Sequence, residues 1–88
     1  MSDDAVNGIE ALRSRIDDVD CKIVALLNER ATLSLAIRAL KPAAGKALYD
    51  PKREEEIFAK LAKCNTGPLF GDNLREIYSA ILHVAKEL

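Results

Sequence analysis

The residues best placed to do chemistry are two cations on one long predicted helix. Arg30 occupies an apolar position between Leu26 and Leu33, where uncompensated burial of a guanidinium is costly. Lys41 follows eleven residues later, which is three helical turns plus about 20°, so the two cations share a face. Arg30 either pairs with a nearby carboxylate or fixes the register of a coiled coil, or it lines a basic groove with Lys41 that would bind an anionic ligand.

Two further groups of charges could join this groove. Arg13 lies roughly 25 Å before Arg30 along the helix and about 100° around it, so it cannot reach the groove of its own chain. In an antiparallel dimer of long helices it could reach the partner's groove. Segment 50–54 (DPKRE) is either a helix start followed by exposed charges or a wall of the groove folded back against Lys41.

The motifs that the chain lacks further limit the kinds of catalysis it could carry out. There is no recognisable Ser-His-Asp triad, glycine-rich phosphate loop, HExxH or CxxC motif. His83, the sole histidine, sits beside the apolar stripe of a predicted helix, and a structural role is favoured for it. No metal or cofactor is implied, so any catalysis would rely on Arg, Lys and carboxylates around a ligand.

A long helix must position these cations. Apolar residues alternately three and four apart form a heptad seam interrupted only by Arg30, the pattern of a helix packed along its length. No Pro or Gly interrupts residues 9–41, so we predict a helix there, with Gly8 at a frayed start and Pro42 beyond its end. The seam consists of Ile9, Leu12, Ile16, Val19, Ile23, Leu26, Arg30, Leu33, Ile37 and Leu40.

Two shorter helices are predicted after a loop at 42–46. Asp50 as N-cap and Pro51 at the first helical position open the second, and 65–68 (NTGP) ends it. The third begins near Asp72 or Asn73. The apolar stripes are Ile57, Phe58 and Leu61 on the second helix and Leu74, Ile77, Tyr78, Ile81, Leu82, Ala85 and Leu88 on the third. The fold class is therefore all-α, with three helices and a very long first one.

The length of the first helix argues for a second copy of the chain. About 33 residues span roughly 50 Å, whereas a domain of this size has a radius of gyration near 12 Å. We expect residues 1–88 to form a single domain, and a partner to cover the rod in an intertwined homodimer.

Composition excludes several classes of protein. The formal net charge of -1 offers no general attraction for nucleic acid. No apolar stretch approaches the roughly 20 residues that a membrane span needs. The start (MSDD) does not resemble a signal peptide, and Cys21 and Cys64 are expected to be reduced thiols. We expect a cytoplasmic protein without nucleic-acid or membrane partners.

Together these features resemble the all-helical class of chorismate mutase, including the mutase domain of bifunctional chorismate mutase–prephenate dehydratases. The resemblance runs from about Ile9 to the C-terminus. It rests on segments 9–13 (IEALR), 17–20 (DDVD) and 26–30 (LLNER), then Lys41, then 50–54 (DPKRE). Each segment is weakly specific alone, but their order and spacing are those of the family.

The resemblance implies a chorismate mutase that converts chorismate to prephenate in aromatic amino-acid biosynthesis, as a homodimer whose active sites are shared between subunits. Arg13 of the partner and Arg30 would clamp the two substrate carboxylates. Lys41 would bind a carboxylate and the ether oxygen whose bond breaks. The family's remaining positions are occupied by Glu54, which would hold the substrate hydroxyl, by Asp50 and Arg53, which would shape the same wall, and by an apolar lining of Ile37, Ile57 and Leu82.

The sequence departs from the family at two positions. The family has a Ser on the third helix that contacts a substrate carboxylate, and Ala85 stands there, so that only its backbone N–H could substitute. The family's Gln or Glu beside the ether oxygen would fall just after Leu88, and Glu87 faces differently. Either the natural protein continues, or the last turn is arranged another way.

Two other functions remain open from the sequence. The chain could be a helical dimerisation or regulatory module that kept the fold without activity, although a pure dimer seam has no use for Arg30. It could also be an isochorismate pyruvate-lyase, which shares the architecture and the cationic pocket. Segment 50–54 looks more like that of a mutase.

Overall fold

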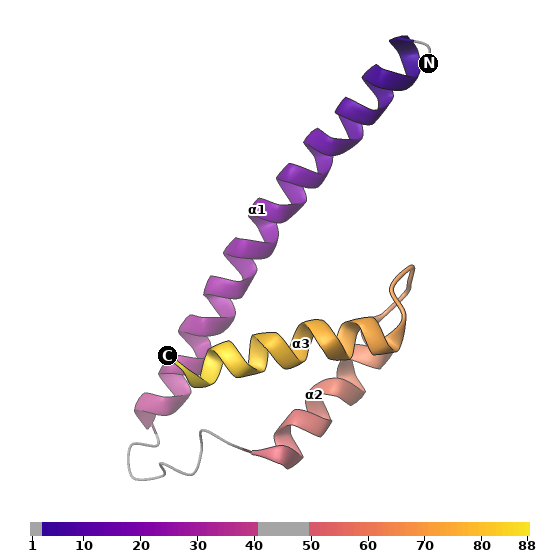
Figure 1. Cartoon of the computed structure of the whole chain (residues 1–88). Helices are drawn as coiled ribbons and strands as arrows, with labels where there is room; N and C mark the ends of the chain where they lie inside the picture. The colour runs from indigo at the N-terminus through magenta and orange to yellow at the C-terminus, as the bar shows by residue number, and fades with distance from the viewer. Residues whose placement is uncertain (1–2, 41–49) are drawn as a thin grey trace. The chain divides into compact units, whose positions relative to one another are not determined.

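The computed structural model describes residues 3–40 and 50–88, and in this part of the chain all regular structure is helical. The elements are α1 (Asp3–Leu40), α2 (Pro51–Cys64) and α3 (Gly71–Lys86) (Figure 1). The all-α fold class with a very long first helix is thereby confirmed. Two units can be distinguished, Met1–Leu33 and Ser34–Leu88, and each is described by itself.

Helix α1 is longer than predicted at its N-terminal end. It has 38 residues and begins at Asp3, so Gly8 lies inside the helix, and the prediction of a frayed start there was wrong. An exposed glycine costs a helix interior only about 1 kcal/mol relative to alanine, which the helix-forming residues around it offset. The helix ends at Leu40, and the predicted last residue, Lys41, lies outside the described residues.

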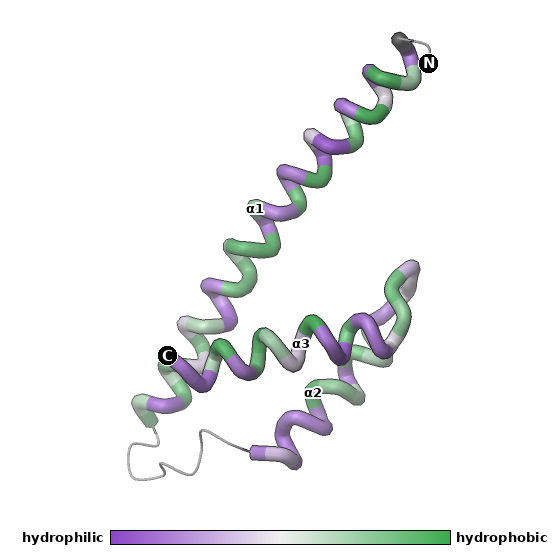
Figure 2. Tube along the Cα trace, in the orientation of Figure 1, coloured by the Kyte–Doolittle hydropathy of each residue, from purple (hydrophilic) through white to green (hydrophobic). Residues whose placement is uncertain are grey.

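The apolar seam of α1 is exposed in the single chain. Every apolar residue of the seam leaves between 42% and 83% of its surface accessible. Apolar and polar residues alternate along the whole helix (Figure 2). The first unit contributes one helix, so it contains nothing against which the seam residues up to Leu33 could be buried.

Helix α2 begins as its sequence predicts. The Asp50 carboxylate accepts a hydrogen bond from the backbone N–H of Arg53 (3.1 Å), and Pro51 occupies the first turn. The helix ends at Cys64, and Asn65 organises the turn beyond it. Its side chain donates to the Leu69 carbonyl (2.8 Å) and accepts from the Gly67 N–H (2.9 Å). Gly67 has a φ of 84°, a conformation that glycine adopts without steric cost.

Helix α3 starts slightly earlier than predicted. Its N-cap is Phe70 and its first residue is Gly71, so neither Asp72 nor Asn73 is the cap. Asn73 nevertheless stabilises the start, because its side-chain oxygen accepts the Phe70 N–H (3.1 Å), as the third residue of a capping box does.

The second unit holds what little core a single chain has. Leu82 of α3 is the one buried hydrophobic residue in the described part of the chain, at 8% exposure. Leu74, Tyr78, Ile81 and Ala85 of the predicted α3 stripe are half-buried, as are Ile57, Phe58 and Leu61 of α2. Ile77 and Leu88 stay exposed. The predicted apolar stripes of α2 and α3 are therefore more protected than the rest of these helices, but only Leu82 among their side chains is buried.

Candidate functional site

The first turn of α2 gathers three of the predicted site residues. Asp50 caps the helix through its carboxylate. Arg53 lies one turn before Glu56, and their charged groups are 3.7 Å apart on the exposed side of the helix. Glu54 is more protected, with a quarter of its side chain exposed. Arg53 and Glu54 are consecutive residues of a helix and therefore point in different directions, each toward a different partner.

Glu54 has a partner that the sequence did not predict. The ammonium of Lys86, in the last turn of α3, lies 3.1 Å from the Glu54 carboxylate. The side chains of Lys86 and Glu54 are 34% and 25% exposed, whereas both members of each other ion pair found within residues 3–40 and 50–88 are more than half exposed. The pair joins the start of α2 to the end of α3.

Ala85 lies next to this ion pair in sequence and is half-buried. Its carbonyl oxygen accepts a hydrogen bond from Nη2 of Arg38 (3.3 Å), and the main-chain oxygen of Leu88 accepts one from Nη1. Arg38 belongs to the part of α1 in the second unit. It therefore supplies a donor to the Ala85 carbonyl, one of those that the end of a helix leaves without an intrahelical partner.

The two predicted arginines of α1 belong to the first unit. Arg13 is exposed and lies 3.1 Å from Glu10, one turn earlier, a surface pair of little energetic weight. Arg30 is half-buried, and no carboxylate of α1 forms an ion pair with it. Within this helix, the interpretation that Arg30 is neutralised by a neighbouring acid finds no support.

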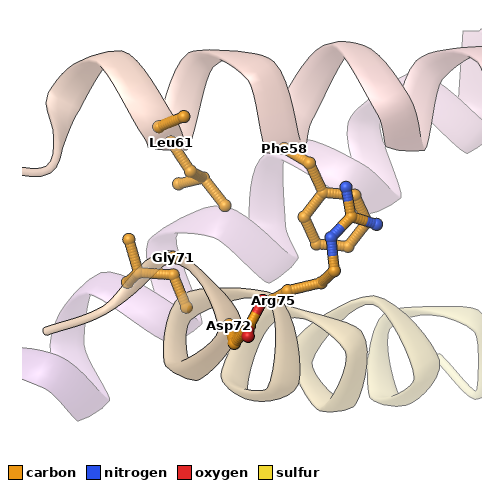
Figure 3. A pocket seen from close by; sticks show the side chains of 7 residues that line it. Phe58, Leu61, Gly71, Asp72 and Arg75 are labelled. Carbon is orange, nitrogen blue, oxygen red and sulfur yellow. The ribbon is translucent and has the colours of Figure 1, made fainter.

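A separate hollow of about 250 Å³ lies between α2 and α3, lined in part by Phe58, Leu61, Gly71 and Asp72. The guanidinium of Arg75 lies over the Phe58 ring, 4.1 Å from its centre (Figure 3). Arg75 also lies 3.7 Å from Glu55. None of the predicted site residues lines this hollow.

Lys41, which carries the central predicted role, lies outside the described residues. Lys86 and Arg38 were missed by the sequence reasoning. Lys86 looks like an ordinary cation at the C-terminal end of a helix, where the dipole favours it. Arg38 directly follows the seam residue Ile37, and this proximity to the apolar face was the only signal for it. Glu87 lies 3.0 Å from His83, and both side chains are exposed.

Three observations bear on other site types. Among the described residues, no three His, Cys, Asp or Glu side chains form a group that could hold a metal ion. Cys21 and Cys64 are both exposed and free. No helix in the ranges 3–40 and 50–88 is long and apolar enough to cross a membrane.

Comparison with known proteins gives one answer throughout. The sequence profile of the family chorismate mutase type II matches residues 12–88. The bifunctional chorismate mutase/prephenate dehydratase of Aquifex aeolicus is 38% identical over 88 residues, covering 91% of this chain and 24% of the relative. The protein of the same name from Neisseria gonorrhoeae is 38% identical over 80 residues, covering 86% and 22%. The chain thus spans about a quarter of the length of these curated relatives.

A solved structure agrees over most of its length. Chorismate mutase (form II) from Thermus thermophilus superposes with a TM-score of 0.85 at 39% sequence identity, and the match covers 91% of each chain. The family profile extends over the apolar seam from Leu12 onward, the segment DPKRE and both shorter helices. The chain therefore belongs to the chorismate mutase type II family.

Proposed function

We propose that this chain is a chorismate mutase that rearranges chorismate to prephenate in the cytoplasm, as a step of aromatic amino-acid biosynthesis. The observation that carries the proposal is the family match across residues 12–88. That range contains every cation of the set recognised in the sequence. The match of a chorismate mutase structure to 91% of this chain supports the same activity.

The reaction suits a site built from cations and carboxylates. It is a rearrangement within one substrate, with no nucleophile and no proton to transfer. The site must hold a flexible dianion in a compact, chair-like geometry, which is catalysis by orientation. Negative charge grows on the ether oxygen as its bond lengthens, and a preplaced cation stabilises that charge more than it stabilises the ground state.

The residue roles follow from this chemistry. Arg30 and Arg13 would clamp the two carboxylates, because an arginine fork matches the carboxylate geometry. Lys41 would place its ammonium at the ether oxygen and stabilise the negative charge that develops there. Glu54 would accept a hydrogen bond from the substrate hydroxyl. Asp50 and Arg53 would hold the start of α2 in place. Ala85 would offer only its backbone N–H, where the family has a serine.

We further propose that the working form is a homodimer with shared active sites. Residues 1–88 of each chain would form a single domain. Two features support this. The seam of α1 is exposed along its whole length, and one buried hydrophobic residue, Leu82, is all that the described part of a single chain provides. Chains this small commonly rely on a partner for the missing core.

The decisive experiment is to follow chorismate loss by the purified chain and to identify the product, beside a Lys41→Ala variant. Prephenate formation that falls about a thousandfold in the variant, the size expected for losing one donor to a developing oxyanion, supports the activity and the role of Lys41 together. A folded protein that leaves chorismate unchanged would favour the non-catalytic module. Pyruvate release from isochorismate without prephenate formation would favour the lyase.

Sharing of the site can be tested by mixing variants. Arg13→Ala and Arg30→Ala chains should each be inactive alone. After mixing and exchange they should regain part of the activity, because one of the two sites in a heterodimer then holds both arginines. Proven heterodimers without any recovery would show that Arg13 is not supplied by the partner.

A further inference from the structure

We propose that Lys86 is a positioning residue for Glu54: its ammonium fixes the Glu54 carboxylate and balances its charge, so that this acid can serve a dianionic substrate. The inference rests on the proposed function. It assigns a role to a residue outside the set of cations and carboxylates recognised in the sequence.

The geometry singles out this contact. Lys86 Nζ and Glu54 Oε2 are 3.1 Å apart, and the pair is more protected from solvent than the other ion pairs in the described part of the chain. Partial burial matters because water screens exposed pairs until they contribute almost nothing. The pair also spans two helices, so it restrains a long, flexible glutamate side chain from outside its own helix.

The charge balance explains why a glutamate would need such a partner. A carboxylate that accepts a hydrogen bond from the substrate hydroxyl must lie close to a molecule that carries two negative charges. In a partly desolvated site, like charges this close repel strongly. With Lys86 in contact, Glu54 presents a hydrogen-bond acceptor that belongs to a neutral pair.

The neighbouring contacts keep Lys86 in place. The turn of α3 that carries it is held by Arg38, which donates to the carbonyl of Ala85 and to the main-chain oxygen of Leu88. Lys86 therefore lies in a helix end whose Ala85 carbonyl has a side-chain partner, which limits fraying of that end.

The test is a double-mutant cycle on the full chain, with chorismate turnover measured for wild type, Lys86→Ala, Glu54→Gln and the double variant. We expect Lys86→Ala to lower kcat/KM about tenfold, within the range that contacting residues show in such cycles. Its changes in kcat and KM should follow the pattern of Glu54→Gln. In the Lys86→Ala background, Glu54→Gln should cost nothing further, because it then removes an unbalanced charge.

Two variants separate positioning from mere stability. Lys86→Arg should restore most of the activity, since it keeps the charge. Glu55→Gln removes the neighbouring exposed acid that faces Arg75 at 3.7 Å, and it should leave kcat and KM unchanged. Thermal unfolding of every variant reports the folded fraction, and Lys86→Gln replaces Lys86→Ala if the alanine variant does not fold.

The outcomes are distinguishable. Wild-type turnover in Lys86→Ala, or an equal loss in the wild-type and Glu54→Gln backgrounds, overturns the role of Lys86 while the proposed function stands. Full activity of Glu54→Gln overturns the role of Glu54 and with it that of Lys86. A folded wild-type chain without turnover overturns the proposed function itself.

Discussion

The exposed seam of α1 makes a quantitative prediction about self-association. Leu26 lies on the seam and is 62% exposed in the single chain. Full burial of a leucine is worth about 1.5–3 kcal/mol, so covering three-fifths of this side chain contributes roughly 1–2 kcal/mol per chain on the same scale. In a symmetric dimer both copies of Leu26 contribute this free energy of burial.

Replacing Leu26 by Ala should therefore weaken the dimer by about 2–4 kcal/mol, which is a rise in Kd of roughly 30- to 1000-fold. Alanine is the best helix former, so α1 itself should lose no helical content. The matched control is Asn28→Ala, an exposed position about 200° around α1 from Leu26. This substitution should leave Kd unchanged.

Sedimentation equilibrium over a range of concentrations measures both values, and far-ultraviolet circular dichroism at the same concentrations follows the helical content. We expect wild-type dimers at micromolar concentration. A wild-type chain that is a stable, well-folded monomer would refute the reasoning. So would a Leu26→Ala dimer as tight as the wild type, because the seam would then not be the contact surface.

Two further predictions concern the second unit. Asp50→Ala removes the side-chain cap of α2 and should cost about 1 kcal/mol, which corresponds to a fall in Tm of roughly 4–8 °C for a domain of this size; Asp50→Ser should keep most of the stability in the same thermal scan. Arg38→Met removes the donors to the last turn of α3 and should speed amide hydrogen exchange there, with unchanged exchange in the first turn of α3 as the internal control; equal protection across the helix would contradict the role assigned to Arg38.

The start of α2 and the ends of the other helices show what local sequence can and cannot predict. Asp50 followed by Pro51 satisfies the N-terminal N–H groups by itself, so the sequence is sufficient. Phe70 has no such signal, because the stabilising oxygen comes from Asn73 three residues later. Gly8 suggested a helix end, but a single glycine costs too little to stop a helix whose neighbours favour it.

The candidate site was predictable only where the chemistry of one residue conflicted with its surroundings. Arg30 drew attention because it interrupts an apolar seam. The contact between Lys86 and Glu54 depends on how α2 crosses α3, a property of packed helices that the order of residue types does not encode. Lys41 remains a prediction from the sequence, because it lies outside the described residues.

The scarcity of buried side chains in a single chain also has a kinetic consequence. If most of the apolar surface finds cover only on a second chain, the encounter of two chains becomes a step of folding, and refolding becomes second order. At a rate constant of about 10⁶ M⁻¹s⁻¹, typical for protein association, chains at 1 μM pair in about a second, whereas at 1 nM they need many minutes. Until then each chain presents the seam of α1 to its surroundings, so refolding should be slower the more dilute the protein is.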